Sequence, residues 1–228
     1  MIHPHRESLF NPLPHVGIGL SVVIIGIEAL FSLGPRGMIG GPDAVGWRLA
    51  AIRDYGFLDR VFDLMRERSV YPPDQLLRFV TYPLIHGSFT HAIFVCVFIL
   101  AIGNMVGVVF RAWAVLVIFF VSSIFGALVF GSVMRSEVPL IGGYPGVYGL
   151  IGAYTFLLWM NQVATGGPQY RAFLLIGLLL GIQLIFGVLF GLGKDWVADL
   201  AGFVAGYALS FVVSPGGWWR LLAKLRKR

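Results

Sequence analysis

The sequence predicts an all-α integral membrane protein, a bundle of six transmembrane helices with an amphipathic in-plane first loop. Of its 228 residues, 57% are hydrophobic and only 12% are charged, which lies outside the range of soluble domains. Apolar runs of about 20 residues recur along the chain, and this is the length that crosses a bilayer. We expect the spans at about 15–33, 86–109, 112–133, 143–163, 171–192 and 195–213.

These spans predict one membrane domain over residues 15–213, with an external loop at 34–78. Residues 1–14 are polar and proline-containing, and we interpret them as a cytoplasmic lead without a cleavable signal peptide. Residues 214–228 form a basic tail directly after the last span, which is typical of a cytoplasmic end near anionic lipid. We therefore expect a bacterial inner-membrane protein with both termini cytoplasmic, a lipid bilayer around it, and no nucleic-acid partner.

The first loop carries an amphipathic segment at 43–68, in which apolar and charged residues recur at spacings of three and four. Such a segment is too charged to span and is suited to the membrane interface. We expect one helix here that ends at Pro72-Pro73. Its interfacial residues, turned toward acyl chains or protein, would be Trp47, Phe57, Val61 and Phe62.

The predicted fourth span begins in a glycine-dense stretch, 142–154, whose glycines recur at spacings of three and four. They share one helical face without side chains, which lets a neighbouring backbone approach closely. Pro145 fits only in the first turn of this helix, where its missing N–H is no loss. The expected helix-packing positions are Gly146 and Gly149 against Gly202 and Gly206 of the sixth span.

This stretch resembles the start of the fourth span of rhomboid intramembrane proteases, which carry Gly-x-Ser-Gly followed by Gly-x-x-Gly-Ala-Tyr. Here Gly149-Leu150-Ile151-Gly152-Ala153-Tyr154 matches the second part. A gapless alignment from it puts Tyr144 at the place of the serine, whereas alignment on Gly143 and Gly146 puts Pro145 there. Both alignments leave the position without a serine.

Two further segments are similar to rhomboid motifs. His86-Gly87-Ser88-Phe89-Thr90-His91 resembles the approach to the second span, where the resemblance implies that the second histidine and an asparagine four residues later stabilise an oxyanion. His91 is present, but Val95 stands at the place of the asparagine. In the sixth span, Ala198, Gly202, Phe203 and Gly206 match the frame of a third rhomboid motif. The resemblance implies that Asp199 stands at the place of the histidine that serves as general base.

The resemblance therefore implies a catalytically inactive rhomboid, a pseudoprotease that binds transmembrane segments of other membrane proteins without cleaving them. Its partner would be an integral membrane protein client. One alternative is a permanent small subunit of a larger membrane complex. A further alternative is an intramembrane protease with a different mechanism.

We expect no cofactor and no metal ion. Glu28, His86, His91 and Asp199 all fall on one side of the predicted bundle, but histidines five residues apart on a helix are turned by about 140° from each other. A hydrogen-bonded polar cluster is the preferred interpretation. Asp199 would accept from the Tyr144 hydroxyl group, which is the first choice, from backbone N–H groups near Gly146, or from a protonated His86 or His91. Alternatively, it would cap the sixth helix, with its carboxylate turned to water and to N–H groups near Gly202. Glu28 would either snorkel to the interface or have a polar partner in the bundle.

Overall fold

The computed structural model describes residues 15–190 and 193–215. The predicted lead and most of the predicted basic tail, 1–14 and 216–228, lie outside these residues. The described chain is helical, and its elements follow one another as α1 (His15–Leu33), η1 (Pro42–Gly46), α2 (Trp47–Tyr55), α3 (Asp59–Arg68), α4 (Pro73–Thr81), η2 (Tyr82–Leu84), α5 (Phe89–Gly107), α6 (Ala112–Val133), α7 (Tyr144–Thr165), η3 (Gln169–Phe173), α8 (Leu174–Phe190) and α9 (Trp196–Val213).

Helices occupy all six predicted span positions, and four of them are long and apolar enough to cross a membrane: α1, α5, α6 and α9. α7 has 22 residues but contains tyrosine, tryptophan, asparagine and glutamine among its apolar side chains. α8 is strongly apolar and has 17 residues. The chain is thus a multi-pass membrane protein, and the number of six spans stays a prediction.

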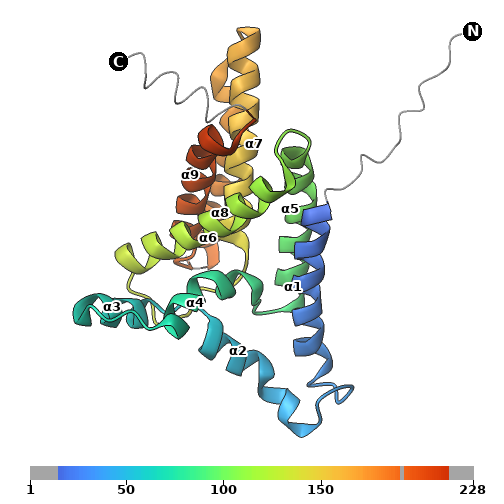
Figure 1. Ribbon diagram of the computed structural model, residues 1–228, viewed down its shortest axis with the longest axis vertical. Coiled ribbons are helices and arrows are strands. Elements are labelled where there is room, and N and C mark those ends of the chain that lie inside the picture. The colour runs from blue at the N-terminus through green and yellow to red at the C-terminus, as the bar shows by residue number, and fades with distance from the viewer. Residues whose placement is uncertain (1–14, 191–192, 216–228) are drawn as a thin grey trace, which may run out of the picture.

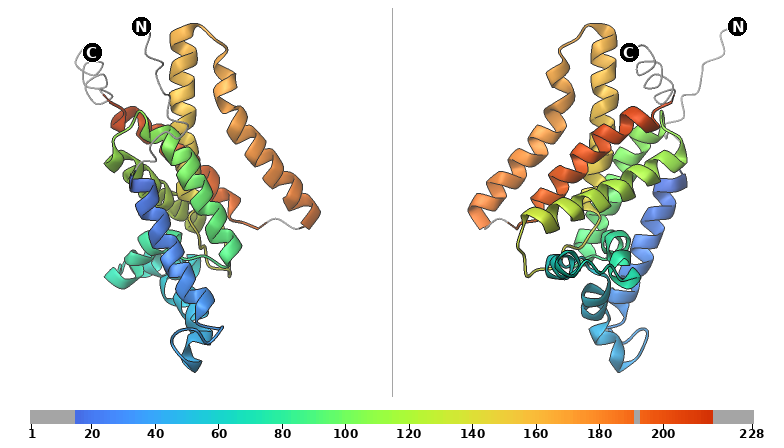
Figure 2. Two further views of the ribbon diagram at one scale, coloured as in Figure 1. Left: turned by 90° about the vertical axis from the view of Figure 1, so that its right-hand side faces the viewer. Right: turned by 60° about the vertical axis from the view of Figure 1, so that its left-hand side comes forward.

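The long helices alternate in direction, so that the start of α1 and the end of α9 lie at the same end of the molecule (Figure 1). α2, α3 and α4 lie across the opposite end. α8 leans away from α7 and leaves the bundle on one side (Figure 2). Its contacts within the described chain are mainly with α7 and η3.

α7 is the central helix of the bundle. Every residue of its first half from Pro145 to Ala153 is buried. Large apolar side chains of α5 and α6, such as Ile99, Ile118 and Phe119, pack against it in the main core. The glycines of α7 make this central position possible because its neighbours reach the helix backbone.

α7 and α9 touch backbone to backbone. A Cβ atom placed on Gly202 would lie 2.2 Å from the carbonyl oxygen of Pro145, and one on Gly206 would lie 2.0 Å from that of Gly149. Side chains of α6 close the other side, since a Cβ atom on Gly146 would lie 2.6 Å from the Phe119 ring. This contact aligns the first turns of α7 and α9, where the candidate site lies.

The expectation of one continuous helix over 43–68 is wrong. α2 ends at Tyr55 and α3 begins at Asp59, because the intervening Phe57 forms an isolated antiparallel bridge with Leu140. A Cβ atom on Gly56 would lie 2.5 Å from the Ile52 carbonyl oxygen, so glycine permits this sharp exit from α2. A bridge of two backbone hydrogen bonds, at 3.0 and 2.8 Å, thus replaces the missing helical ones.

Arg78 of α4 stabilises the same break. Its guanidinium donates to the carbonyl oxygens of Arg53 and Gly56, at 2.8 Å each. The last carbonyl groups of a helix lack intrahelical donors, and Arg78 supplies one at the end of α2. The three loop helices therefore form a connected layer.

Two of the four expected interfacial residues pack inside the protein. Phe57 and Phe62 are buried in a second core with Phe79, Tyr82 and Phe130, whereas Trp47 and Val61 are half-buried. The side chains that this layer leaves exposed include Leu49 and Leu64. An in-plane position in the membrane stays a prediction.

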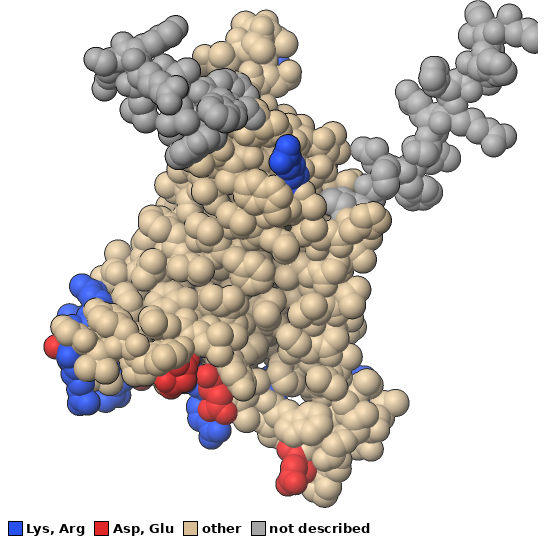
Figure 3. Space-filling view, in the orientation of Figure 1, with Lys and Arg blue, Asp and Glu red and all other residues tan. Residues whose placement is uncertain are grey.

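The surface separates charge from apolar area. In Figure 3 the body of the molecule shows a wide belt without charged side chains, and acidic and basic groups gather at the end that carries α2, α3 and α4. Such a belt matches the hydrocarbon region of a bilayer.

Candidate functional site

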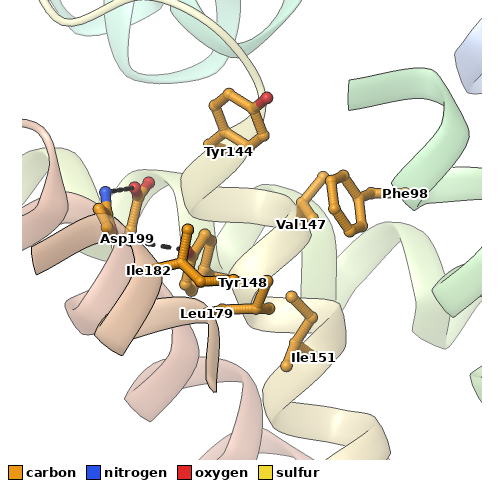
Figure 4. A pocket seen from close by; sticks show the side chains of 9 residues that line it. Phe98, Tyr144, Val147, Tyr148, Ile151, Leu179, Ile182 and Asp199 are labelled. Carbon is orange, nitrogen blue, oxygen red and sulfur yellow. Dashed lines mark hydrogen bonds between the residues drawn. The ribbon is translucent and has the colours of Figure 1, made fainter. Parts of the chain in front are cut away.

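The candidate site lies where the first turns of α7 and α9 meet the middle of α8. Asp199 is 4% exposed, and its Oδ2 atom accepts a hydrogen bond from Gln183 Nε2 at 3.1 Å. The Oε1 atom of Gln183 in turn accepts from the Tyr148 hydroxyl group at 3.3 Å (Figure 4). α7, α8 and α9 each contribute one side chain to this chain of hydrogen bonds.

The expected partner of Asp199, Tyr144, does not donate to it. The Tyr144 ring stacks on His91, with ring centroids 5.0 Å apart and an angle of 17° between the planes, and its hydroxyl group points away from Asp199 (Figure 4). The alternative of a water-facing cap is also wrong, because the Asp199 carboxylate is buried. The donor to Asp199 is instead the amide of Gln183. This residue lies on α8, which the sequence does not place beside α9.

The two histidines of the second motif lie together, edge to face, with ring centroids 4.9 Å apart. His86 is 1% exposed, and its Nε2 atom accepts from the Gly143 N–H at 3.4 Å. Burial, with a smaller contribution from His91, lowers the pKa of His86 to about 4. His86 is therefore neutral at physiological pH and supports the turn before α7 as an acceptor.

Val95 is fully buried and contributes only apolar surface. A Cβ atom on Gly143 would lie 2.8 Å from Val95 Cγ1, so the valine packs directly against the turn that leads into α7. An isopropyl group donates no hydrogen bond, and it fills this position as a spacer.

Glu28 has a polar partner inside the bundle and does not snorkel. Its carboxylate is 1% exposed and accepts hydrogen bonds from both terminal nitrogens of Arg48, at 2.6 and 2.9 Å. The same guanidinium donates to the His86 carbonyl oxygen at 2.7 Å. This ion pair connects α1, α2 and the histidine motif, and it therefore fixes the loop layer to the site.

Two cavities meet at Asp199. The lateral cavity, of about 310 Å³, opens between α5, α7 and α8 and is lined by Phe98, Tyr144, Val147, Tyr148, Ile151, Leu179, Ile182, Gln183 and Asp199 (Figure 4). The polar cavity, of about 340 Å³, is lined by Ser88, Thr90, His91, Phe94, Leu140, Ile141, Tyr144, Pro145, Gln183, Asp195 and Asp199. Tyr144, Gln183 and Asp199 border both.

The sequence interpretation did not foresee Gln183, Tyr148 and Asp195 at this site. A signal existed for Asp195, because it precedes Asp199 by four residues and residues at this spacing share a helix face. Gln183 is the only amide in the otherwise apolar sequence of α8, and an isolated polar residue in a span indicates a polar partner. Its position beside Asp199 depends on how α8 packs.

Tyr144 and Pro145 both lie in the first turn of α7 and both line the polar cavity. Neither has an aliphatic hydroxyl group or a thiol. Within the residues that the structure describes, no three histidine, cysteine, aspartate or glutamate side chains are grouped so that they could hold a metal ion.

Fold and site together define a helical multi-pass membrane protein whose central helix, α7, begins at a buried polar site. The rhomboid domain family matches residues 73–216, which is more than half of the chain, and the protein belongs to the rhomboid family. The family resemblance of the three motifs is thereby confirmed. No curated protein matches the chain at a significant level.

Proposed function

We propose that this rhomboid-family protein is a pseudoprotease that binds transmembrane segments of other membrane proteins without cleaving them. The observation that carries the proposal is the hydrogen bond between Asp199 and Gln183 at the family's general-base position. Nucleophilic catalysis needs a hydroxyl or thiol group within hydrogen-bond reach of a base. Among the described residues, the partner of Asp199 is an amide instead.

The contacts of two hydroxyl groups beside the polar cavity, those of Ser88 and Tyr144, support the same conclusion. The Ser88 Oγ atom accepts the His91 N–H at 3.2 Å and thereby caps α5. Tyr144 is a phenol stacked on an imidazole, and a phenol with an ordinary pKa near 10 is a weak nucleophile at neutral pH. Val95 adds no oxyanion donor.

Binding is supported by the lateral cavity. Five of its nine lining residues are apolar aliphatic or phenylalanine side chains, and α8 leans away from the bundle on this side (Figure 2). A concave apolar surface that opens between two helices can receive side chains of a third helix.

The absence of proteolytic chemistry is tested with a serine-directed fluorophosphonate probe on the purified protein, with an active serine hydrolase as positive control. We expect no covalent labelling. Labelling that disappears in Ser88→Ala or Tyr144→Phe would overturn the proposal and identify the nucleophile.

The binding role is tested by a photo-crosslinking amino acid at Leu179, which lines the lateral cavity, with Val121 on the exposed side of α6 as the matched control. We expect crosslinks to other membrane proteins from position 179 and far fewer from position 121. Equal yields at both positions would contradict a binding site at the cavity.

Purification in a gentle detergent separates a client-binding protein from a permanent subunit of a larger complex. A mixed set of substoichiometric membrane proteins supports client binding. One partner in constant stoichiometry would instead assign the chain to a stable complex.

A further inference from the structure

The lining of the polar cavity contains acidic side chains but no lysine or arginine. It includes the carboxyl groups of Asp195 and Asp199, one turn apart at the start of α9. The neighbouring groups of this lining are neutral and polar: Ser88, Thr90, His91, Tyr144 and Gln183.

Two buried atoms at this cavity lack hydrogen-bond partners among the described residues, Asp199 Oδ1 and His91 Nε2. The single bond from Gln183 satisfies only the other carboxylate oxygen of Asp199. Buried polar groups are normally paired, and a buried carboxylate oxygen without a donor is costly. Asp199 Oδ1 is therefore a buried acceptor for which the described chain supplies no donor.

The apolar lateral cavity continues into this polar region. Both cavities are bordered by Asp199, Gln183 and Tyr144. An occupant with an apolar body and a polar end could therefore place its body in the lateral cavity and its polar end in the polar cavity. The polar cavity lies at the starts of α5, α7 and α9, and these helices begin at the end of the bundle that carries α2, α3 and α4 (Figure 1).

We infer that the polar cavity binds the lysine or arginine side chain of a transmembrane segment whose apolar residues lie in the lateral cavity. This inference rests on the proposed function and names the chemistry of the client. An ammonium or guanidinium group favours the ionised form of Asp199 and donates to its Oδ1 atom in a charge-assisted hydrogen bond. Asp195 adds a second carboxyl group to the lining.

A metal ion does not fit the same space. The carboxylates and the imidazole at the cavity do not form a group of three ligands among the described residues, and metal sites in proteins take four or more ligands. An organic cation that makes one or two directed hydrogen bonds matches the atoms present.

The test uses the full-length protein in lipid nanodiscs and fluorescent synthetic peptides of about 20 leucine and alanine residues, the length of one span. The peptides differ at one position near one end, which is lysine, glutamine or glutamate. Fluorescence anisotropy gives Kd. We expect the lysine peptide to bind at least ~10-fold more tightly than the glutamine peptide, since charge-assisted hydrogen bonds are about twice as strong as neutral ones. The glutamate peptide should bind most weakly.

Variants locate the effect. Asp199→Asn should abolish most of the preference for lysine while the glutamine peptide still binds, and Asp195→Asn should weaken the preference. Asp43→Asn removes an exposed carboxylate on η1 and should change nothing. The peptide series on the unaltered protein decides the question even where a variant does not fold.

The outcomes separate the two proposals. Equal Kd values for the lysine and glutamine peptides would overturn the inference and leave the proposed function intact. Failure of all three peptides to bind would overturn the proposed function, and the inference with it. A preference for lysine that persists in both Asp199→Asn and Asp195→Asn would overturn the assignment to this cavity.

Discussion

Glu28 shows how a single residue pair holds the loop layer on the bundle. The carboxylate is buried in α1, and Arg48, whose side chain is 22% exposed, supplies both of its charged hydrogen bonds. A buried ion pair contributes little net stability compared with apolar residues, but removal of one partner leaves an uncompensated charge.

We therefore predict that Arg48→Met lowers the free energy of unfolding by about 3–5 kcal/mol, the usual cost of an unpaired buried charge. The double variant Glu28→Gln/Arg48→Met should regain much of this loss, because neither charge is then present. Thermal unfolding in detergent measures both. Arg36→Met, at an exposed position, is the matched control. An Arg48→Met protein as stable as this control would contradict the role of the pair.

At the scale of helices, the contact between α7 and α9 positions the site. Gly206 lies against the backbone of Gly149, and Gly202 against that of Pro145. In a bilayer, small residues at such contacts let van der Waals packing hold two helices together, since apolar burial alone does not distinguish protein from lipid.

A methyl group at Gly206 must push the two helices apart. We predict that Gly206→Ala lowers the free energy of unfolding by about 1–3 kcal/mol, the range of overpacked cores. Gly177→Ala on α8 is the control, because nothing lies within 4 Å of its Cβ position, and loss of a helical glycine should stabilise by about 0.5–1 kcal/mol. If thermal unfolding shows that Gly206→Ala is as stable as Gly177→Ala, α7 and α9 are not in backbone contact.

For the whole molecule, the alternation of the helices places both described ends of the bundle on one side and the charged loop layer on the other (Figure 1). Each crossing reverses the side of the membrane, so an even number of spans returns the chain to the side from which it started. With α7 and α8 counted as spans, the number is six.

We predict that a cysteine in place of Arg68, an exposed residue at the end of α3, reacts with a membrane-impermeant maleimide in intact bacterial cells that express the protein. Cysteines appended to either terminus should react only after the cells are opened. Cys96 is buried, and its replacement by alanine removes background labelling. Labelling of one terminus in intact cells would contradict six spans, and labelling of both would reverse the orientation.

Much of the membrane architecture follows from the sequence because it depends on local properties. Apolar length locates the helices, since backbone groups in lipid must be paired within the helix. Glycine spacing locates the face of α7 that a neighbour can approach. The three ordered motifs predict the rhomboid family, and the match of the rhomboid domain over residues 73–216 confirms it.

The rest was decided by tertiary structure, because it depends on which side chains meet across different helices. Arg48 reaches Glu28 from 20 residues away, and the bridge between Phe57 and Leu140 breaks a segment whose own periodicity is helical. Gln183 reaches Asp199 only through the position of α8. Residue periodicity defines the face that a helix buries, but the partner of a buried charge is the nearest donor in space, and that donor is set by how the helices pack.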